Sequence, residues 1–281
     1  MLILGCGYLG THIAKLAADQ NFRIDALTRN QATCAHLGTL SVNQALGFEL
    51  ADPSWHDLIN PQDYQAIVLC VGSAESTPEG YRKSYIQGIE SVLDWVGERF
   101  GGKLLYTSSI SVYGDAQGAW VDESTMPAPT NWRGEIILES ERLLRKALPE
   151  QSYIFRLGGI YGPDRNRFLS PATKPDPKSS EGYLNLIHVE DAAAALLAAI
   201  LHPSTGNRLY NLTDNHPVKR SEIHAFIQSR HLPGGAKPKQ EKPSSHRSNA
   251  ANRRIDSSRI QHDLDWKPAY PSVFEAIPHM V

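Results

Sequence analysis

The sequence predicts an α/β fold in which a parallel sheet is covered by helices on both faces. Strand-like and helix-like stretches alternate along most of the chain, which is typical of parallel sheets. Residues 66–71 form an unbroken apolar run, as expected of a central strand that is buried on both faces. A second apolar run, over residues 1–4, leads directly into a glycine-rich turn and a helical stretch. Together these features predict a Rossmann-type doubly wound sheet.

The glycine-rich turn has a G-x-G-x-x-G pattern that suits a dinucleotide. The first glycine permits the tight bend, the second lets the backbone approach a pyrophosphate, and the third brings the helix close to the strand. Residues 12–20 follow as a helical stretch with an apolar side. We therefore expect a nicotinamide or flavin nucleotide at this helix N-terminus, with a purely structural turn as the alternative. The expected cofactor contacts are Gly5, Gly7, Tyr8, Leu9 and Gly10.

The end of the second predicted strand, residues 23–29, indicates which nucleotide fits. Sites selective for NAD place a carboxylate about 20 residues beyond the glycine motif, where it holds the ribose 2′-hydroxyl. Here that position is Thr28, followed by Arg29, and the competing acid, Asp25, lies inside the strand. A guanidinium beside a hydroxyl suits a 2′-phosphate. The sequence therefore favours NADP over NAD, and the alternative is that Arg29 is a solvated loop charge.

The sequence predicts the other elements of the core in order along the chain. Pro149 ends the helix that precedes the sixth strand. We expect a third strand over 45–50, a fourth over 66–71, a long helix over 79–99, a fifth strand over 103–108, a helix over 134–148 and a sixth strand over 153–157.

Beyond residue 160 the alternation becomes less regular. Residues 162–182 and 231–248 are rich in Pro, Lys and Ser, which predicts loops, the second of them mobile. The expected elements here are short strands at 185–188 and 210–212 and helices at 190–201 and 256–264. We expect residues 1–160 to form the nucleotide-binding core. Residues 161–281 should form a small substrate-side cap that is interleaved with it, in one structural domain overall.

Composition excludes several classes of function. The 281 residues are 41% hydrophobic and 21% charged, with a net charge of -2, so nothing favours nucleic acid or an anionic membrane as partner. The longest apolar run, residues 192–201, is too short to span a bilayer. Met1 leads directly into a strand, which does not resemble a signal peptide. Cys6, Cys34 and Cys70 lack metal-ligand spacing and suit reduced thiols. We therefore expect a cytoplasmic protein without a metal site.

At this point the chain resembles the short-chain dehydrogenase/reductase superfamily, in its extended but atypical NAD(P)-dependent epimerase/dehydratase-like branch. The resemblance covers nearly the whole length and depends on several motifs in a fixed order. They are Gly5-Cys6-Gly7-Tyr8-Leu9-Gly10, Thr107-Ser108-Ser109-Ile110-Ser111-Val112-Tyr113-Gly114, Arg156-Leu157-Gly158-Gly159-Ile160-Tyr161-Gly162-Pro163, Asn185-Leu186-Ile187-His188-Val189-Glu190-Asp191, Tyr210-Asn211-Leu212 and Leu264-Asp265-Trp266-Lys267-Pro268.

The resemblance implies roles for individual residues. Asp52 would approach the adenine, while Val71, Gly72 and Ser73 would pass beside the ribose. Leu157 and Gly158 would lie against the nicotinamide. Ser109 matches the family's catalytic serine, which bonds the substrate oxygen that is oxidised or reduced. The alternative for Ser109 is a hydroxyl that satisfies backbone at a strand end.

The sequence departs from the family where proton transfer should occur. The first glycine loop is one residue shorter than the usual form, and Tyr85 stands where the family has an Asn. The catalytic Tyr-x-x-x-Lys is missing, because Arg133 and Ile137 occupy its two positions. Arg133 cannot exchange a proton, but it could stabilise an oxyanion or hold an anionic substrate. The catalytic candidates are therefore Ser109, Tyr85 and Arg133, with packing or a solvated charge as the alternatives for the last two.

Two functions from different classes remain open. One is an NADP-dependent oxidoreductase or epimerase of atypical mechanism, with NAD as a second possible cofactor and a nucleotide-linked sugar or small carbonyl compound as substrate. The other is a non-catalytic dinucleotide-binding protein that senses redox state or binds a partner. An anionic substrate is favoured by cations on the predicted 162–182 loop, and a homodimer stays open as an assembly state. These cations are Arg165, Arg167, Lys174 and Lys178.

Overall fold

The computed structural model describes residues 1–166, 182–203, 208–230 and 251–280. Its centre is a seven-stranded sheet in the order β11-β7-β5-β4-β1-β2-β3, and every pair of neighbouring strands is parallel. The predicted doubly wound parallel sheet is therefore confirmed. The strands are β1 (Leu2–Leu4), β2 (Asp25–Leu27), β3 (Gln44–Leu46), β4 (Ala66–Leu69), β5 (Lys103–Ser109), β7 (Ser152–Leu157) and β11 (Arg208–Leu212).

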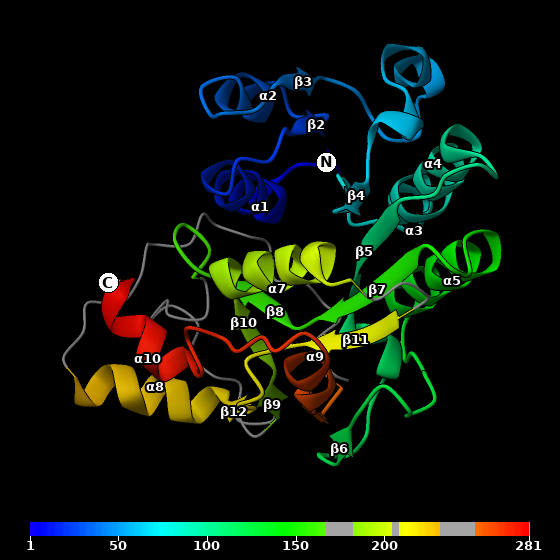
Figure 1. The fold of residues 1–281 in the computed structure, drawn as a ribbon. Helices are drawn as coiled ribbons and strands as arrows, with labels where there is room; N and C mark the ends of the chain where they lie inside the picture. The colour runs from blue at the N-terminus through cyan, green and yellow to red at the C-terminus, as the bar shows by residue number, and fades with distance from the viewer. Residues whose placement is uncertain (167–181, 204–207, 231–250, 281) are drawn as a thin grey trace.

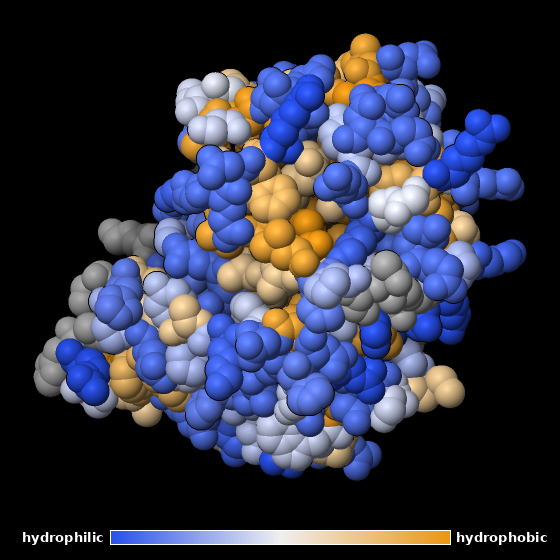
Figure 2. Space-filling model, viewed as in Figure 1, coloured by the Kyte–Doolittle hydropathy of each residue, from blue (hydrophilic) through white to orange (hydrophobic). Residues whose placement is uncertain are grey.

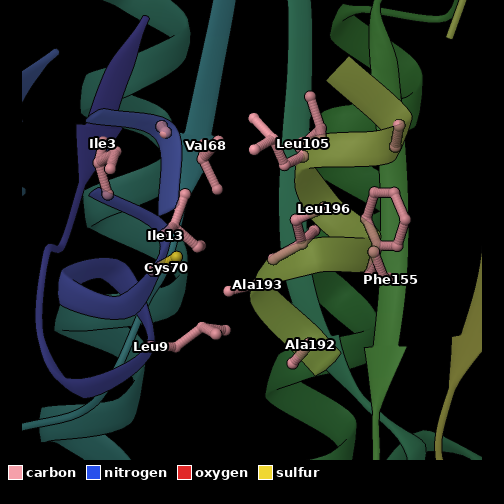
Figure 3. Packing of buried hydrophobic residues seen from close by; sticks show 14 of the residues in the cluster. Ile3, Leu9, Ile13, Val68, Cys70, Leu105, Phe155, Ala192, Ala193 and Leu196 are labelled. Carbon is pink, nitrogen blue, oxygen red and sulfur yellow. The ribbon is translucent and has the colours of Figure 1, made fainter. Parts of the chain in front are cut away.

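Helices cover both faces of the sheet (Figure 1). One face packs against α1 (Tyr8–Asp19) and α7 (Val189–Leu201), and Figure 3 shows apolar side chains of both helices directed toward the strands. Ile3, Val68, Leu105 and Phe155 from four strands fill this layer and are buried. The opposite face packs against α4 (Gly88–Val96) and α5 (Trp132–Ala147). Burial on both faces explains why the central strands are apolar without alternation.

Some predicted boundaries differ from the structure. The third strand ends at Leu46 rather than residue 50, because the ladder with β2 ends where Thr28 N–H donates to Leu46 O at 2.9 Å. The predicted long helix consists of α3 (Pro78–Arg82), a π-helical turn (Lys83–Gln87) and α4. A π-turn inside a helix commonly marks a functional site.

The chain beyond residue 160 contributes one strand to the sheet and also forms a smaller group of elements beside it. β11 pairs with β7 as an edge strand, and α7 packs beside α1. The remaining elements form a smaller group around Tyr161 and Leu186 in the lower part of Figure 1. They include β8 (Gly159–Tyr161), β9 (Tyr183–Leu184), β10 (Leu186–His188), β12 (Val218–Lys219), α8 (Arg220–Ser229) and α10 (Val273–Ala276). The helix α9 (Ser258–Asp263) packs instead against β11 of the sheet.

Several sequence predictions concern residues outside the described ranges. These are most of the 162–182 loop with Arg167, Lys174 and Lys178, and the 231–248 segment.

Alanine-rich α7 holds the longest apolar run, yet no described helix is both long and apolar enough to cross a membrane. In the view of Figure 2 the surface is mainly hydrophilic, and apolar side chains gather in a central hollow.

Candidate functional site

A cleft of about 630 Å³ opens where the chain leaves the carboxyl ends of β1, β2 and β4. Ligands of open parallel sheets bind at this edge, where neighbouring loops diverge. The glycine turn lines the cleft together with segments that follow the three strands. Its described lining includes Gly5, Gly7, Tyr8, Leu9, Gly10, Thr28, Arg29, Val71, Gly72, Ser73, Tyr81, Lys83, Tyr85, Ile160 and Arg165.

The three glycines of the turn meet different constraints. Gly5 has φ +72°, and a Cβ there would lie 2.5 Å from Cys70 O, so a side chain would collide with the end of β4. A Cβ on Gly10 would lie 3.0 Å from Cys6 Sγ, which keeps α1 close to β1. A Cβ on Gly7 would meet nothing closer than Gly5 O at 3.9 Å. Gly7 therefore leaves room in the cleft itself, as a pyrophosphate requires.

The N-terminus of α1 can receive an anion. Gly7 caps the helix without a side-chain hydrogen bond, and the first turn contains no acidic residue. Its backbone N–H groups and the positive end of the helix dipole face the glycine turn. The residues present thus fit the pyrophosphate of a dinucleotide.

The end of β2 presents polar and cationic groups rather than an acid. Thr28 and Arg29 both line the cleft, and Thr28 Oγ1 accepts the Asn30 N–H at 3.4 Å. Asp25 lies at the other end of the strand, where it is buried and accepts hydrogen bonds from Asn43 Nδ2 at 2.7 Å and Tyr64 OH at 2.9 Å. Asp25 is therefore a structural residue and cannot reach a ribose in the cleft.

The segment after β3 supplies cleft residues that the sequence did not identify. Residues 48–51 line the cleft, and Glu49 forms an ion pair with Lys83 of the π-turn. Asp52, expected beside the adenine, is not among the lining residues. Its carboxylate caps the following 3-10 turn by accepting the Ser54 N–H at 3.0 Å. The adenine contact of Asp52 stays a prediction, and Glu49 is an acid nearer to the cleft.

Tyr85 is the catalytic candidate that the fold brings into the cleft. Its hydroxyl donates to Val71 O at 3.4 Å, a long hydrogen bond that leaves the phenol available. Burial, with a smaller contribution from Tyr81, raises the pKa of Tyr85 to about 12, and Arg29 opposes this rise. The phenol is therefore protonated at neutral pH and can donate a proton, but it is a poor base.

Ser109 and Arg133 are not among the residues that line the described cleft. Ser109 Oγ accepts the Ser111 N–H at 3.1 Å at the end of β5, which is the structural role weighed for it, although its own proton remains available. Arg133 is exposed, and its guanidinium stacks on Trp132 at 4.7 Å and on Tyr81 at 5.7 Å. Tyr81 in turn stacks on Tyr85 with 5.2 Å between ring centroids. The aromatic rings thus connect Arg133 to the cleft wall.

Leu157 and Gly158, expected against the nicotinamide, are not in the described lining either. Leu157 is buried in the core, and a Cβ on Gly158 would lie 2.6 Å from Asn185 O. Ile160 lines the cleft from the same stretch of chain. His188 is buried, and its Nδ1 accepts the Glu190 N–H at 3.4 Å, which caps α7.

A buried ion pair behind the site was not apparent from the sequence. Arg156 of β7 donates from Nε and Nη2 to the carboxylate of Glu141 in α5, at 3.0 and 2.6 Å. Both side chains are about 3% exposed, and Ser108 Oγ also donates to Glu141. The Arg156 guanidinium also lies over the ring of Tyr113 at 4.7 Å. The sequence signal for it was an arginine inside the run predicted as the sixth strand, residues 153–157.

Comparisons with known proteins identify a family and a shared fold. The family model described as "NAD dependent epimerase/dehydratase family" matches residues 1–213. Protein YeeZ of Escherichia coli K12 is 29% identical over 275 residues, which cover 96% of this chain and 95% of that protein. MoeE5 in complex with UDP-glucuronic acid and NAD has a TM-score of 0.80 at 17% identity, over 99% of this chain and 96% of that one. A UDP-glucose 4-epimerase with UDP-glucose from Thermotoga maritima has a TM-score of 0.79 at 16% identity, over 99% and 96% of the two chains. The two solved structures show the fold that is shared.

Proposed function

The chain belongs to the NAD-dependent epimerase/dehydratase family, and we propose that it binds NADP(H) in the cleft and acts as an oxidoreductase or epimerase of atypical mechanism. The observation that carries this proposal is the cleft itself. It joins the open backbone at Gly7, the Thr28–Arg29 edge and the Tyr85 phenol in one cavity.

NADP is favoured over NAD by the charges around the ribose end of the cleft. Arg29 has no carboxylate within ion-pairing distance among the described residues, so its charge is available to a 2′-phosphate. MoeE5 is described with NAD, which makes NAD the alternative cofactor here. Titration of NADPH and NADH against wild type and Arg29→Ala distinguishes the two cofactors.

The proposed substrate is a nucleotide-linked sugar or a small carbonyl compound. MoeE5 is described with UDP-glucuronic acid and the Thermotoga maritima protein with UDP-glucose. Arg133, exposed and without a described carboxylate partner, could hold an anionic group of such a substrate beside the aromatic rings. A homodimer and a cytoplasmic location are compatible with this function and form part of the proposal.

The mechanism requires a proton donor or acceptor near the hydride-transfer atom. A bound nicotinamide supplies or accepts the hydride. Tyr85 holds a proton at its hydroxyl and could deliver it to a developing alkoxide, while Ser109 could orient the substrate oxygen. Arg133 stabilises negative charge but cannot shuttle a proton. Oxidation, which needs a base, is less well served by these residues than reduction.

A second candidate function is non-catalytic dinucleotide binding, for redox sensing or partner binding. It is favoured by the positions of the usual Tyr and Lys, where Arg133 is exposed and Ile137 is buried in the core. Ile137 carries no positive charge, so it cannot lower the pKa of a neighbouring proton donor as the usual Lys does.

Turnover measurements separate the two candidates. We expect clear NADPH binding but slow oxidation of NADPH with simple sugars and carbonyl compounds, because losing a positioned acid–base group costs about 10²–10⁴-fold in rate. In the enzyme, Ser109→Ala and Tyr85→Phe should each reduce this turnover while NADPH affinity is kept. Binding without any turnover over a broad substrate panel favours the second candidate. Fast turnover that neither variant changes would show that the active site lies elsewhere.

A further inference from the structure

We propose that Arg165, held on the ring of Tyr8, is a cation that binds the pyrophosphate of the bound dinucleotide beside the N-terminus of α1. This inference rests on the proposed function, since it names a further binding residue in the same cleft. The glycine turn and the helix N-terminus offer backbone N–H groups to the pyrophosphate, and Arg165 would add a side-chain charge next to them.

Tyr8 connects the glycine turn to a segment far away in the sequence. It lies directly after Gly7 and is the first residue of α1. Its hydroxyl donates to Pro163 O at 2.8 Å, which ties the 162–165 turn to the start of the helix. A Cβ on Gly162 would lie 2.8 Å from that hydroxyl, so the turn approaches Tyr8 closely. Tyr8 therefore places the backbone of this turn at the glycine loop.

The same turn brings the Arg165 side chain into the cleft. Gly162 and Arg165 exchange backbone hydrogen bonds, with N···O distances of 3.1 and 3.4 Å, which fixes the position of Arg165. Its guanidinium lies 5.3 Å from the centroid of the Tyr8 ring, and the residue lines the cleft together with Gly5, Gly7 and Gly10. A stacked guanidinium is pre-oriented and keeps its edge free for hydrogen bonds.

The charge of Arg165 is available for a ligand. Of the cations that line the described cleft, Lys83 is paired with Glu49, whereas Arg29 and Arg165 have no described carboxylate within ion-pairing distance. Arg29 follows β2, at the ribose end, while Arg165 lies beside the glycine turn. The helix N-terminus offers only about half an elementary charge. A pyrophosphate carries more negative charge than that, so a guanidinium facing it adds a charge-assisted and often bidentate contact.

The two arginines should therefore recognise different groups. Arg165 should contribute to the binding of every ligand with a diphosphate at the glycine turn, whether or not it carries a 2′-phosphate. Arg29 should contribute only when the 2′-phosphate is present. The affinity for a nucleoside without phosphate should depend on neither arginine.

The test compares Arg165→Ala and Arg165→Lys with Lys15→Ala, which removes an exposed cation from α1 outside the cleft lining. Dissociation constants are measured for NADH and NADPH by fluorescence and for ADP, UDP and adenosine by calorimetry. Because Arg165 is exposed, its removal should leave the thermal melting temperature unchanged. Arg165→Ala should weaken NADH, NADPH and ADP binding by about 10- to 100-fold, the size of a charge-assisted contact. Adenosine affinity should stay within about twofold.

Arg165→Lys should be intermediate, since it keeps the charge and loses the bidentate geometry. The inference is overturned by unchanged NADH affinity in Arg165→Ala, or by an equal loss in Lys15→Ala, which would indicate a general charge effect. If Arg165→Ala weakened the binding of UDP alone, the guanidinium would contact the diphosphate of a different ligand, and the inference would also be overturned. Unchanged NADH binding in Arg165→Ala beside a loss in Gly7→Val overturns only this inference, whereas a wild-type protein that binds neither NADH nor NADPH overturns the proposed function.

Discussion

In the glycine turn, Gly5 is required for folding and Gly7 for ligand binding. Gly5 is required by the backbone, because its φ is +72° and a side chain would collide with Cys70 O. Gly7 has no such neighbour, so its lack of a side chain serves only what enters the cleft. Two glycines of one motif thus meet different physical requirements.

This difference leads to a prediction for two substitutions. Gly7→Val should fold normally but lose NADP(H) binding, since its side chain would occupy the place of the pyrophosphate. Gly5→Ala should instead lower the melting temperature, because strain at a positive φ costs on the order of 1 kcal/mol before the collision is counted. Fluorescence titration and thermal denaturation of both variants check this. Retained NADPH affinity in a folded Gly7→Val protein would contradict the assignment of the turn.

Arg29 carries the prediction for cofactor choice. NADPH should bind more tightly than NADH by about 1–3 kcal/mol, the size of charge-assisted contacts to the 2′-phosphate. Arg29→Ala should remove this difference and leave NADH affinity nearly unchanged. Titration of both cofactors against wild type and variant measures it. Equal affinities in the wild type would refute the preference for NADP.

Among the elements, α5 and β7 are joined by the Arg156–Glu141 pair rather than by apolar contact alone. Both charges are removed from water, so each depends on the other. The same helix begins at the Asn131 cap, whose Oδ1 accepts the N–H groups of Arg133 and Gly134 at 3.1 Å. The Asn131 cap and the Arg156–Glu141 ion pair together fix the position of α5, which contains Arg133 in its first turn.

Two glutamates of α5 provide a matched pair of substitutions. Glu141→Ala leaves Arg156 buried and unpaired, and should lower the free energy of unfolding by about 3–5 kcal/mol. Glu139 forms an exposed pair with Arg82, at 3.2 Å, so Glu139→Ala should cost about 0–1 kcal/mol. Urea denaturation of both variants gives the two values. Similar small losses would mean that the buried pair contributes little to the packing of α5 on the sheet.

At the scale of the whole molecule, a buried acid ties the C-terminal segment to a helix that covers the sheet. Asp191, at the start of α7, accepts the N–H groups of Ala269 and Tyr270 at 2.7 and 3.0 Å. Asp214 follows β11, and its carboxylate accepts the His216 N–H at 3.0 Å. Burial raises the pKa of both carboxyls, and Asp191 raises that of Asp214 further.

The raised pKa of Asp214 predicts how stability depends on pH. A carboxyl whose pKa is higher in the folded state stabilises the fold below its unfolded pKa, and this stabilisation is lost as pH rises through the folded value. Asp214→Asn keeps an acceptor for His216 and carries no charge. The variant should therefore be more stable than wild type at pH 8, and the difference should shrink as the pH falls. Thermal denaturation from pH 4 to 8 measures it, and a difference independent of pH would contradict the prediction.

Much of the fold could be predicted because its signals are local. The apolar run at 66–71 and the Pro149 stop each depend on neighbouring residues, and β4 (Ala66–Leu69) and the end of α5 lie where they indicate. The helix expected over 12–20 begins earlier, at Tyr8, because α1 starts directly after Gly7 within the glycine motif. The boundaries of β3 and the π-turn were missed, since the ladder to β2 and the packing of the helix set them. Of the site residues, Gly7, Arg29 and Tyr85 were predicted and line the cleft.

The sequence by itself determined the parallel α/β fold, the glycine turn and the absence of the usual proton-transfer pair. Strand burial, turn conformation and motif spacing depend on residues close together along the chain. Only the tertiary structure decided that Arg165 lies over Tyr8, that Glu49 pairs with Lys83 and that Arg156 is neutralised by Glu141. These contacts join segments that are distant in sequence, and packing of the whole sheet and its helices brings them within bonding distance.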